Sequence, residues 1–338
     1  MGSLDIGIDL GTCNIYAMDS ALSKILREPS VVSVDKRSGK VTGTGQAVYD
    51  MIGKTPGHIE VIHPLQDGVI SNFGMTEVLI RHLLRKITDN QLLKPRVCLC
   101  VSSAITNVES QAVIDAAISA GARKVYLIEE PVAAAIGAGL DLSLPVGNMI
   151  VDVGGGTTDI AVLSLNGIVC KASVKVAGQA FDEALAKYVR NKYNLLIGER
   201  TAERIKIEVG SVCDDMEETF ADVKGRDLIS GLPKKVALRR SETLQALREP
   251  MDQILTAVVS VLERTPPELA ADIRENGLLL TGGSVQLTGF AQAIERRTKV
   301  PARIVDDPER CVAVGTALSF QYLGKLYDGF LATSTHAH

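Results

Sequence analysis

One short pattern occurs twice in this chain, and it limits the possible folds more than any other feature. Residues 6–12 and 150–157 both run from an apolar strand to an aspartate, a glycine turn and a threonine. Asp-Gly turns are common, but each copy here lies between a buried strand and a segment that can return as its hairpin partner. The repeat therefore favours a duplicated α/β architecture, and 338 residues are enough for two lobes.

Segments between and after the two copies alternate between helix and strand patterns. The spacing of leucine and isoleucine predicts a helix over about 76–87. A capping box at 106–109 predicts a second helix, which Gly121 should end. Later in the chain, Asn166-Gly167 predicts a two-residue hairpin turn. This alternation supports the α/β class.

Charge and composition exclude several functional classes. The net charge of −4 argues against a nucleic-acid partner. The six cysteines lack the paired spacing of a zinc site or a redox pair, which favours a reducing compartment. The sequence shows neither a signal peptide nor an uncharged apolar run of about 18 residues. We therefore expect a cytoplasmic protein, or at most one that lies on a membrane surface.

The two glycine turns have the composition of a phosphate-binding site. Glycine lets backbone N–H groups approach phosphate oxygens closely, and the hydroxyls of Thr12, Thr157 and Thr158 can add hydrogen bonds. Asp9 and Asp152 would repel a polyphosphate unless a cation stood between them, so the pattern implies a hydrated Mg²⁺. A tight hairpin is the alternative for either copy alone. The pair, with a third glycine turn late in the chain, favours a phosphate clamp.

A pair of glutamates follows another predicted strand. Glu129-Glu130-Pro131 stands at the end of this strand, where α/β sheets place functional groups. One of the glutamates can polarise a water molecule for attack on a phosphate. Acidic residues also stabilise the N-terminus of a helix without any catalytic role. The residues alone leave both interpretations open.

Several motifs resemble known families. The phosphate and adenosine motifs shared by actin, sugar kinases and DnaK-type chaperones are similar to Asp9-Leu10-Gly11-Thr12, Glu130-Pro131, residues 152–159 and Thr281-Gly282-Gly283. A closer resemblance, to the MreB/Mbl family of bacterial actins, lies in residues 27–32, 64–70, 197–203, 230–233 and 264–269. The likeness runs from about Asp5 to Tyr322, which is nearly the whole chain.

The resemblance implies an actin-like (ribonuclease H-like) duplicated fold, with two lobes and four subdomains around a nucleotide cleft. The expected subdomains are IA at 4–34, 64–146 and 308–327, IB at 35–63, IIA at 147–178 and 249–307, and IIB at 179–248. Residues 328–338 are expected to be a tail with a disordered end.

The resemblance also implies roles for individual residues. Glu130 would orient the hydrolytic water, assisted by Thr157 or Thr158, and Asp9 and Asp152 would hold Mg²⁺ through water. ATP or ADP would contact Asp9, Gly11, Thr12, Cys13, Asn14, Asp152, Gly154, Gly155, Gly156, Thr157, Glu203, Arg204, Ile205, Lys206, Gly282, Gly283, Ser284 and Val285. Five residues depart from the family pattern, namely Cys13, Asn72, Ser102, Ser103 and Ser284.

Members of this family polymerise with ATP beneath the inner membrane and guide wall synthesis in rod-shaped bacteria. The resemblance therefore implies three partners, which are further copies of the chain, the membrane surface and the cell-wall elongation machinery. Leu92 and Leu93 match an apolar loop that contacts membranes, although the same loop can pack on its own protein. Two alternatives stay open: a nucleotide-binding scaffold with little hydrolysis, and a small-molecule kinase of the same superfamily.

Overall fold

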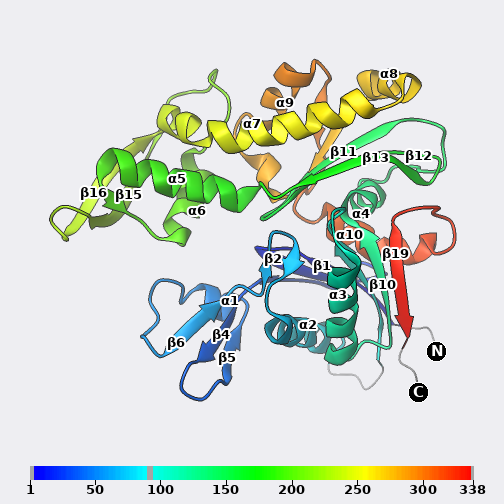
Figure 1. The fold of residues 1–338 in the computed structure, drawn as a ribbon, viewed down its shortest axis with the longest axis horizontal. Coiled ribbons are helices and arrows are strands. Elements are labelled where there is room, and N and C mark those ends of the chain that lie inside the picture. Colours follow the sequence, from blue (N-terminus) through cyan, green and yellow to red (C-terminus); the bar gives the residue numbers. More distant parts are fainter. Residues whose placement is uncertain (1–3, 90–93, 336–338) are drawn as a thin grey trace.

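The computed structural model describes residues 4–89 and 94–335, with side chains up to residue 330. Lobe I, the lower part of Figure 1, is built on a six-stranded sheet. Its strands, in spatial order, are β19 (Phe330–Thr335), β10 (Lys124–Glu129), β9 (Arg96–Val101), β1 (Asp5–Leu10), β2 (Asn14–Asp19) and β3 (Ile25–Pro29). Helices of this lobe are α2 (Phe73–Ile87), α3 (Asn107–Ala120), α4 (Glu130–Gly137) and α10 (Cys311–Leu318), with the 3₁₀ helix η2 (Ser319–Tyr322).

Lobe II, the upper part of Figure 1, is built on a five-stranded sheet. Its strands, in spatial order, are β13 (Gly167–Val174), β12 (Thr158–Ser164), β11 (Asn148–Val153), β17 (Leu278–Thr281) and β18 (Ala302–Ile304). Helices of this lobe are α7 (Arg240–Arg264), α8 (Pro267–Asn276) and α9 (Phe290–Thr298), with the 3₁₀ helix η1 (Gly283–Gln286).

The two sheets share one topology. In lobe I the hairpin β1–β2 is antiparallel and β1 pairs in parallel with β9. In lobe II the hairpin β11–β12 is antiparallel and β11 pairs in parallel with β17. The duplication predicted from the two glycine turns is therefore confirmed. Because β1 and β11 occupy equivalent positions, both aspartates lie at equivalent ends of their strands.

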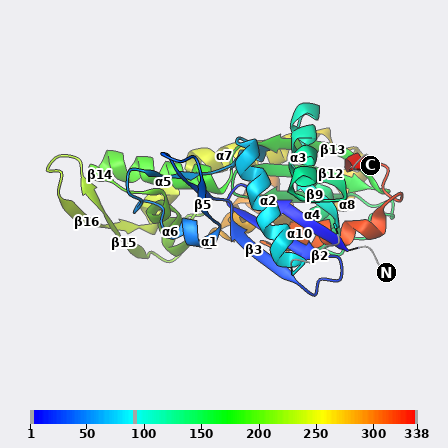
Figure 2. The same cartoon turned by 90° about the horizontal axis from the view of Figure 1, so that it is seen from below.

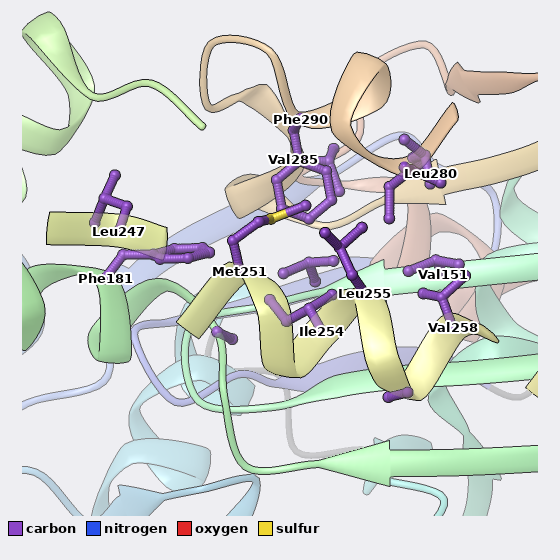
Figure 3. Close-up of a cluster of buried hydrophobic side chains, with 14 of the residues drawn as sticks. Val151, Phe181, Leu247, Met251, Ile254, Leu255, Val258, Leu280, Val285 and Phe290 are labelled. Carbon is purple, nitrogen blue, oxygen red and sulfur yellow. The ribbon is translucent and has the colours of Figure 1, made fainter. Parts of the chain in front are cut away.

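A shared helical layer separates the two sheets. Alternate residues of a strand point to opposite faces, so Val97 and Leu99 pack with α2 and α3, whereas Cys98 and Cys100 pack with α4. Cys98 and Cys100 therefore share one face of β9. The cluster around α4 also contains Ile150 of lobe II. On its other face the lobe II sheet is covered by α7, whose side chains pack around Val151, Leu280 and Phe290 in Figure 3.

Two smaller sheets lie at the same end of the molecule, on the left in Figure 1. The one on lobe I comprises β4 (Val32–Asp35), β5 (Val41–Thr44) and β6 (Ile59–Ile62), with α1 (Gln46–Tyr49) and the hairpin β7 (Leu65–Gln66) and β8 (Val69–Ile70) nearby. The one on lobe II comprises β14 (Leu195–Leu196), β15 (Phe220–Asp227) and β16 (Pro233–Arg239), with α5 (Gly178–Tyr193) and α6 (Glu199–Val209). They occupy the regions predicted as subdomains IB and IIB, although β4 begins before residue 35 and α7 before residue 249.

Helix ends follow the local signals. Thr106 and Glu109 make both hydrogen bonds of the predicted capping box, and Gly121 ends α3 with φ 119°. The helix predicted at 76–87 begins earlier, at Phe73, because the Asn72 side chain accepts a hydrogen bond from Met75 N and caps it.

The turn between β12 and β13 lies one residue before the predicted position. Ser164 pairs with Gly167, so the two loop residues are Leu165 and Asn166, with φ of 50° and 60°. Leucine is unfavourable at positive φ. Backbone hydrogen bonds from Leu165 N to Leu144 O and from Asn166 N to Leu142 O hold the turn against a neighbouring segment. Tertiary contacts therefore override the local preference for Asn166-Gly167 as the loop.

The expected disordered end is wrong for part of the segment. Residues 330–335 form β19, which pairs antiparallel with β10. Without this strand, β10 would be the edge of the lobe I sheet, with unpaired backbone groups along one side. Residues 330–335 therefore form a strand because β10 offers a pairing edge, and not because of their own composition.

Helices α4 and α10 approach each other closely enough for their backbones to touch. A Cβ on Gly315 would lie 1.7 Å from Ala133 O, and one on Gly137 would lie 1.9 Å from Cys311 O. We expect Gly315→Ala to lower the free energy of unfolding by about 3 kcal/mol, because the helices must separate. Gly57→Ala is the matched control, since a Cβ there meets no atom within 4 Å. Urea denaturation measures both, and an unchanged midpoint for Gly315→Ala would contradict the close contact.

Candidate functional site

The two lobes face each other across a cleft with a volume of about 320 Å³. Both glycine turns, α6 and the third glycine turn after β17 contribute to its wall. Predicted site residues that line the cleft are Asp9, Gly11, Thr12, Cys13, Asn14, Glu130, Asp152, Gly154, Gly155, Gly156, Thr157, Glu203, Lys206, Gly282, Gly283 and Ser284. Residues from far apart in the sequence thus surround one cavity.

The two glycine turns touch each other at the floor of the cleft. A Cβ on Gly155 would lie 2.4 Å from Cys13 Sγ, and one on Gly156 would lie 2.5 Å from Thr12 Oγ1. A Cβ at either position would displace the Cys13 or the Thr12 side chain. Burial raises the pKa of the Cys13 thiol to about 12, so this side chain is neutral beside the turns. The contact brings the backbone N–H groups of both lobes to one place, as a phosphate clamp requires.

Carboxyl groups converge next to these turns. Asp9 and Asp152 are the second-last residues of β1 and β11, Glu130 begins α4, and all three line the cleft. Burial raises the pKa of Asp9 to about 6. Burial and the neighbouring carboxylates, with Asp159 among them, hold the pKa values of Glu130 and Asp152 well above the usual range. Such a group of buried acids is costly unless a cation or a proton neutralises it.

The acid pair fits a hydrated Mg²⁺. Asp152 Oδ1 is buried and has no hydrogen-bond partner in the described part of the chain. The described residues contain no group of three or more His, Cys, Asp or Glu side chains placed to hold a metal ion by themselves. Mg²⁺ commonly takes one or two carboxylates and completes its shell with phosphate oxygens and water. Asp9 and Asp152 would therefore hold the ion only together with a nucleotide.

Asp159 connects the two lobes behind these acids. Its Oδ1 accepts hydrogen bonds from Ser102 Oγ at 2.9 Å and from Ser103 N at 2.7 Å. We expect Ser102→Ala to lower the free energy of unfolding by about 1–2 kcal/mol, because it removes one of these bonds. Ser103→Ala is the matched control, since Ser103 Oγ is buried without a partner within the described residues and its loss should be neutral or stabilising. Urea denaturation measures the free energy of unfolding of both variants. Equal losses for Ser102→Ala and Ser103→Ala would contradict a stabilising hydrogen bond from Ser102 Oγ to Asp159.

Four predicted site residues lie outside the cleft wall. Thr158 is buried and its Oγ1 donates to Val176 O at 2.7 Å, so Thr157 is the threonine that lines the cleft. Val285 is buried in the lobe II core (Figure 3). Ile205 belongs to the same core. Arg204 turns the other way and donates to Glu208 and to Asp222 O.

Helical periodicity explains the division along α6. Glu203 and Lys206 are one turn apart and line the cleft with Ile207. The two residues between Glu203 and Lys206 point in other directions. Ile205 points into the core of lobe II, and Arg204 points toward the small sheet of lobe II. Of the four consecutive residues predicted to contact the nucleotide, Glu203 and Lys206 therefore line the cleft, and Arg204 and Ile205 do not.

The structure accommodates serine in the third glycine turn. Gly282 has φ 88°, whereas Ser284 has no positive φ. Ser284 Oγ donates to Gly154 O at 2.7 Å, which ties the third turn to the second one. The departure from the family pattern at this position therefore adds a hydrogen bond without straining the backbone.

One cluster in the cleft wall was missed by the sequence interpretation. Tyr16 donates to Glu309 Oε2 at 3.2 Å, Gln286 donates to Glu309 Oε1 at 3.0 Å, and Arg27 lies opposite Tyr16 on the neighbouring strand. Strand periodicity offered a signal for Tyr16, since it is two residues after Asn14 and shares its face. Glu309 had no such signal. Other lining residues that were not predicted are Leu10, Gly68, Gly178, Leu287, Thr288, Pro308 and Val312.

The predicted membrane contact cannot be placed on the fold. Leu92 and Leu93 lie outside the described residues. No helix within 4–89 or 94–335 combines the length and the apolar character that crossing a bilayer requires.

Sequence comparisons give close relatives for nearly the whole chain. The MreB/Mbl protein family model matches residues 3–327. The cell shape-determining protein Mbl of Bacillus subtilis (strain 168) is 46% identical over 327 residues, covering 96% of this chain and 98% of Mbl. The cell shape-determining protein MreB of Escherichia coli (strain K12) is 46% identical over 321 residues, covering 93% of this chain and 92% of MreB.

Solved structures agree with this placement. MreB5 of Spiroplasma citri bound to ADP superposes with a TM-score of 0.90 at 36% identity, covering 96% of this chain and 98% of MreB5. The AMPPNP-bound form of the same protein gives a TM-score of 0.91. The MamK double helical filament, at 22% identity, gives a TM-score of 0.81 and supports the actin-like fold alone.

Proposed function

This chain belongs to the MreB/Mbl family, and from that membership we propose that it is an ATPase that binds ATP between its lobes and polymerises into filaments. The single observation that carries the proposal is the contact between the two glycine turns beneath Asp9, Asp152 and Glu130. Structures of MreB5 with ADP and AMPPNP support a nucleotide in this cleft.

The cleft residues have distinct roles in this proposal. Backbone N–H groups of both glycine turns bind the phosphates, and the Thr157 hydroxyl assists at the γ-phosphate. Asp9 and Asp152 would hold Mg²⁺ through water, and a bound ion would supply positive charge next to the phosphate oxygens. Glu130 orients the attacking water by accepting its hydrogen bond. Glu203, Lys206 and the third glycine turn contact the nucleoside.

Filaments of this protein would lie at the inner face of the cell membrane and organise wall synthesis. The names of the relatives, which are cell shape-determining proteins, support this role. Membrane attachment would come from Leu92 and Leu93, repeated along the filament so that weak contacts add up. The partners are further copies of the chain, the membrane surface and the cell-wall elongation machinery.

Assembly is the property that tests the proposal most directly. Purified protein should sediment with Mg²⁺ and ATP, and electron microscopy on anionic lipid should show filaments lying on the membrane. EDTA should reduce the sedimented fraction, because the acid pair would then face the phosphates without a cation. A protein that stays monomeric at high concentration in every nucleotide state would contradict the proposal.

A further inference from the structure

A contact between the lobes bridges the mouth of the cleft. Tyr49, the last residue of α1, donates its hydroxyl hydrogen to Glu203 Oε2 on α6. Figure 2 shows α1 and α6 at the same end of the molecule, and the hydrogen bond joins the small sheet region of lobe I to that of lobe II. Tyr49 thus reaches across from lobe I to Glu203, a lining residue of lobe II.

Arg200, one turn before Glu203, strengthens this bridge. Its guanidinium carbon lies 4.8 Å from the centroid of the Tyr49 ring, a cation–π distance. Its Nη1 donates to Asp50 O at 3.2 Å. A second contact between the lobes joins His63 Nε2 to Glu199 Oε2 at 3.8 Å. Tyr49 therefore sits in a set of contacts that fixes its ring against α6.

The lobe I side of the bridge is itself anchored. Gln46 N, at the start of α1, donates to Glu28 Oε2 at 3.1 Å. Glu28 is also paired with Lys86 of α2. Because α1 is only four residues long, this anchor fixes Tyr49 relative to the lobe I sheet. The hydroxyl is thereby presented to Glu203 at a set position.

Glu203 has one oxygen left for a ligand. Its Oε2 accepts from Tyr49, whereas Oε1 accepts no hydrogen bond from any described residue. The side chain lines the cleft. A carboxylate with one oxygen held and the other exposed to a cavity is suited to accept a hydrogen bond from a sugar hydroxyl.

We propose that Tyr49 is a positioning residue for the ribose of the bound nucleotide. Its hydroxyl holds Glu203 Oε2, so that Oε1 accepts a hydrogen bond from a ribose hydroxyl, and the same contact closes the cleft mouth over the nucleoside. The proposal rests on the nucleotide-binding function proposed above, in which Glu203 contacts the nucleoside, and adds Tyr49 as the residue that positions this carboxylate. It also gives lobe I a role in recognising the ribose, although the residue that contacts the ribose belongs to lobe II.

Calorimetric titration with Mg-ADP and with Mg-2′,3′-dideoxy-ADP tests this role. The wild-type protein should prefer ADP, and Tyr49→Phe should reduce that preference about tenfold, since a hydrogen bond to a charged group is lost. Glu203→Gln should reduce it similarly, and the double variant should lose little more than either single one. Tyr188→Phe is the matched control, because this hydroxyl contacts Gln245 on the surface of lobe II.

Three results would overturn the proposal. In the first, Tyr49→Phe keeps the wild-type preference for ADP. In the second, the wild-type protein binds both nucleotides equally, which refutes ribose recognition while nucleotide binding stands. In the third, the wild-type protein binds neither, which refutes the proposed nucleotide site itself. A purely structural role for Tyr49 would change both affinities by the same factor and would leave their ratio intact.

Discussion

Glu130→Gln should lower the rate of phosphate release from ATP by about 100- to 10,000-fold, the range expected when a group that orients and activates water is lost. Glu130 is half-buried at the start of α4 and lines the cleft together with Asp152. Glutamine keeps the size of the side chain but is a poor proton acceptor. ADP binding should change little. Release of phosphate in single turnover measures the effect.

Glu129→Gln is the matched control for this experiment. Glu129 precedes Glu130 directly, but its Oε2 is paired with Lys171 Nζ at 2.6 Å rather than facing the cleft. The folded Glu129 variant should therefore hydrolyse ATP at close to the wild-type rate. Equal rates for Glu130→Gln and wild type would remove Glu130 from the catalytic role and would favour a nucleotide-binding scaffold.

Asp9→Asn should stabilise the nucleotide-free protein and weaken Mg-nucleotide binding by about 10- to 100-fold. Burial raises the pKa of Asp9 from 3.8 to about 6, so the folded state binds more protons than the unfolded state between these values. The contribution of Asp9 to the free energy of unfolding therefore falls as pH rises from about 4 to about 6 and is level above that. The carboxylate costs about 3 kcal/mol at neutral pH, of which the amide should recover a part.

Urea denaturation in EDTA at pH 4.5 and 7.5 tests whether the Asp9 carboxylate lowers the free energy of unfolding as pH rises. The gain of Asp9→Asn over wild type should be larger at pH 7.5, because Asp9 is charged there. Other buried acids of the cleft contribute the same trend to both proteins, so only the difference between the two is diagnostic. A variant less stable than wild type at pH 7.5 would contradict the interpretation. The binding loss is measured separately, by calorimetry with Mg-ADP.

Local patterns predicted the parts of this fold that depend on neighbouring residues. The strand, aspartate and glycine sequence around Asp9 and Asp152 is such a pattern, and so is the capping box at Thr106. The direction in which individual side chains point was harder to predict from the sequence than these local patterns. Sequence placed Thr157 and Thr158 together at the phosphates, but Thr157, just before β12, lines the cleft, whereas Thr158, the first residue of β12, donates a hydrogen bond to Val176 O.

Features that depend on distant segments could not be predicted from the sequence. β19 forms because β10 offers an unpaired edge, and Leu165 adopts positive φ because residues 142 and 144 hold the turn. Tyr49 and Glu203 are 154 positions apart, and nothing in either local sequence indicates the other. Such pairs follow from how the lobes close, which is a property of the whole chain.

The position of α10 has a consequence for synthesis. This helix comes from residues 311–318, yet it packs in the middle layer against α4 and against β1, which carries Asp9. A nascent chain that has not yet left the ribosome beyond residue 300 therefore lacks the layer that covers its first strand. We expect it to bind no nucleotide and to join no filament until residues 311–318 emerge. Because α10 packs late in synthesis, chains that are still being made would not assemble into filaments.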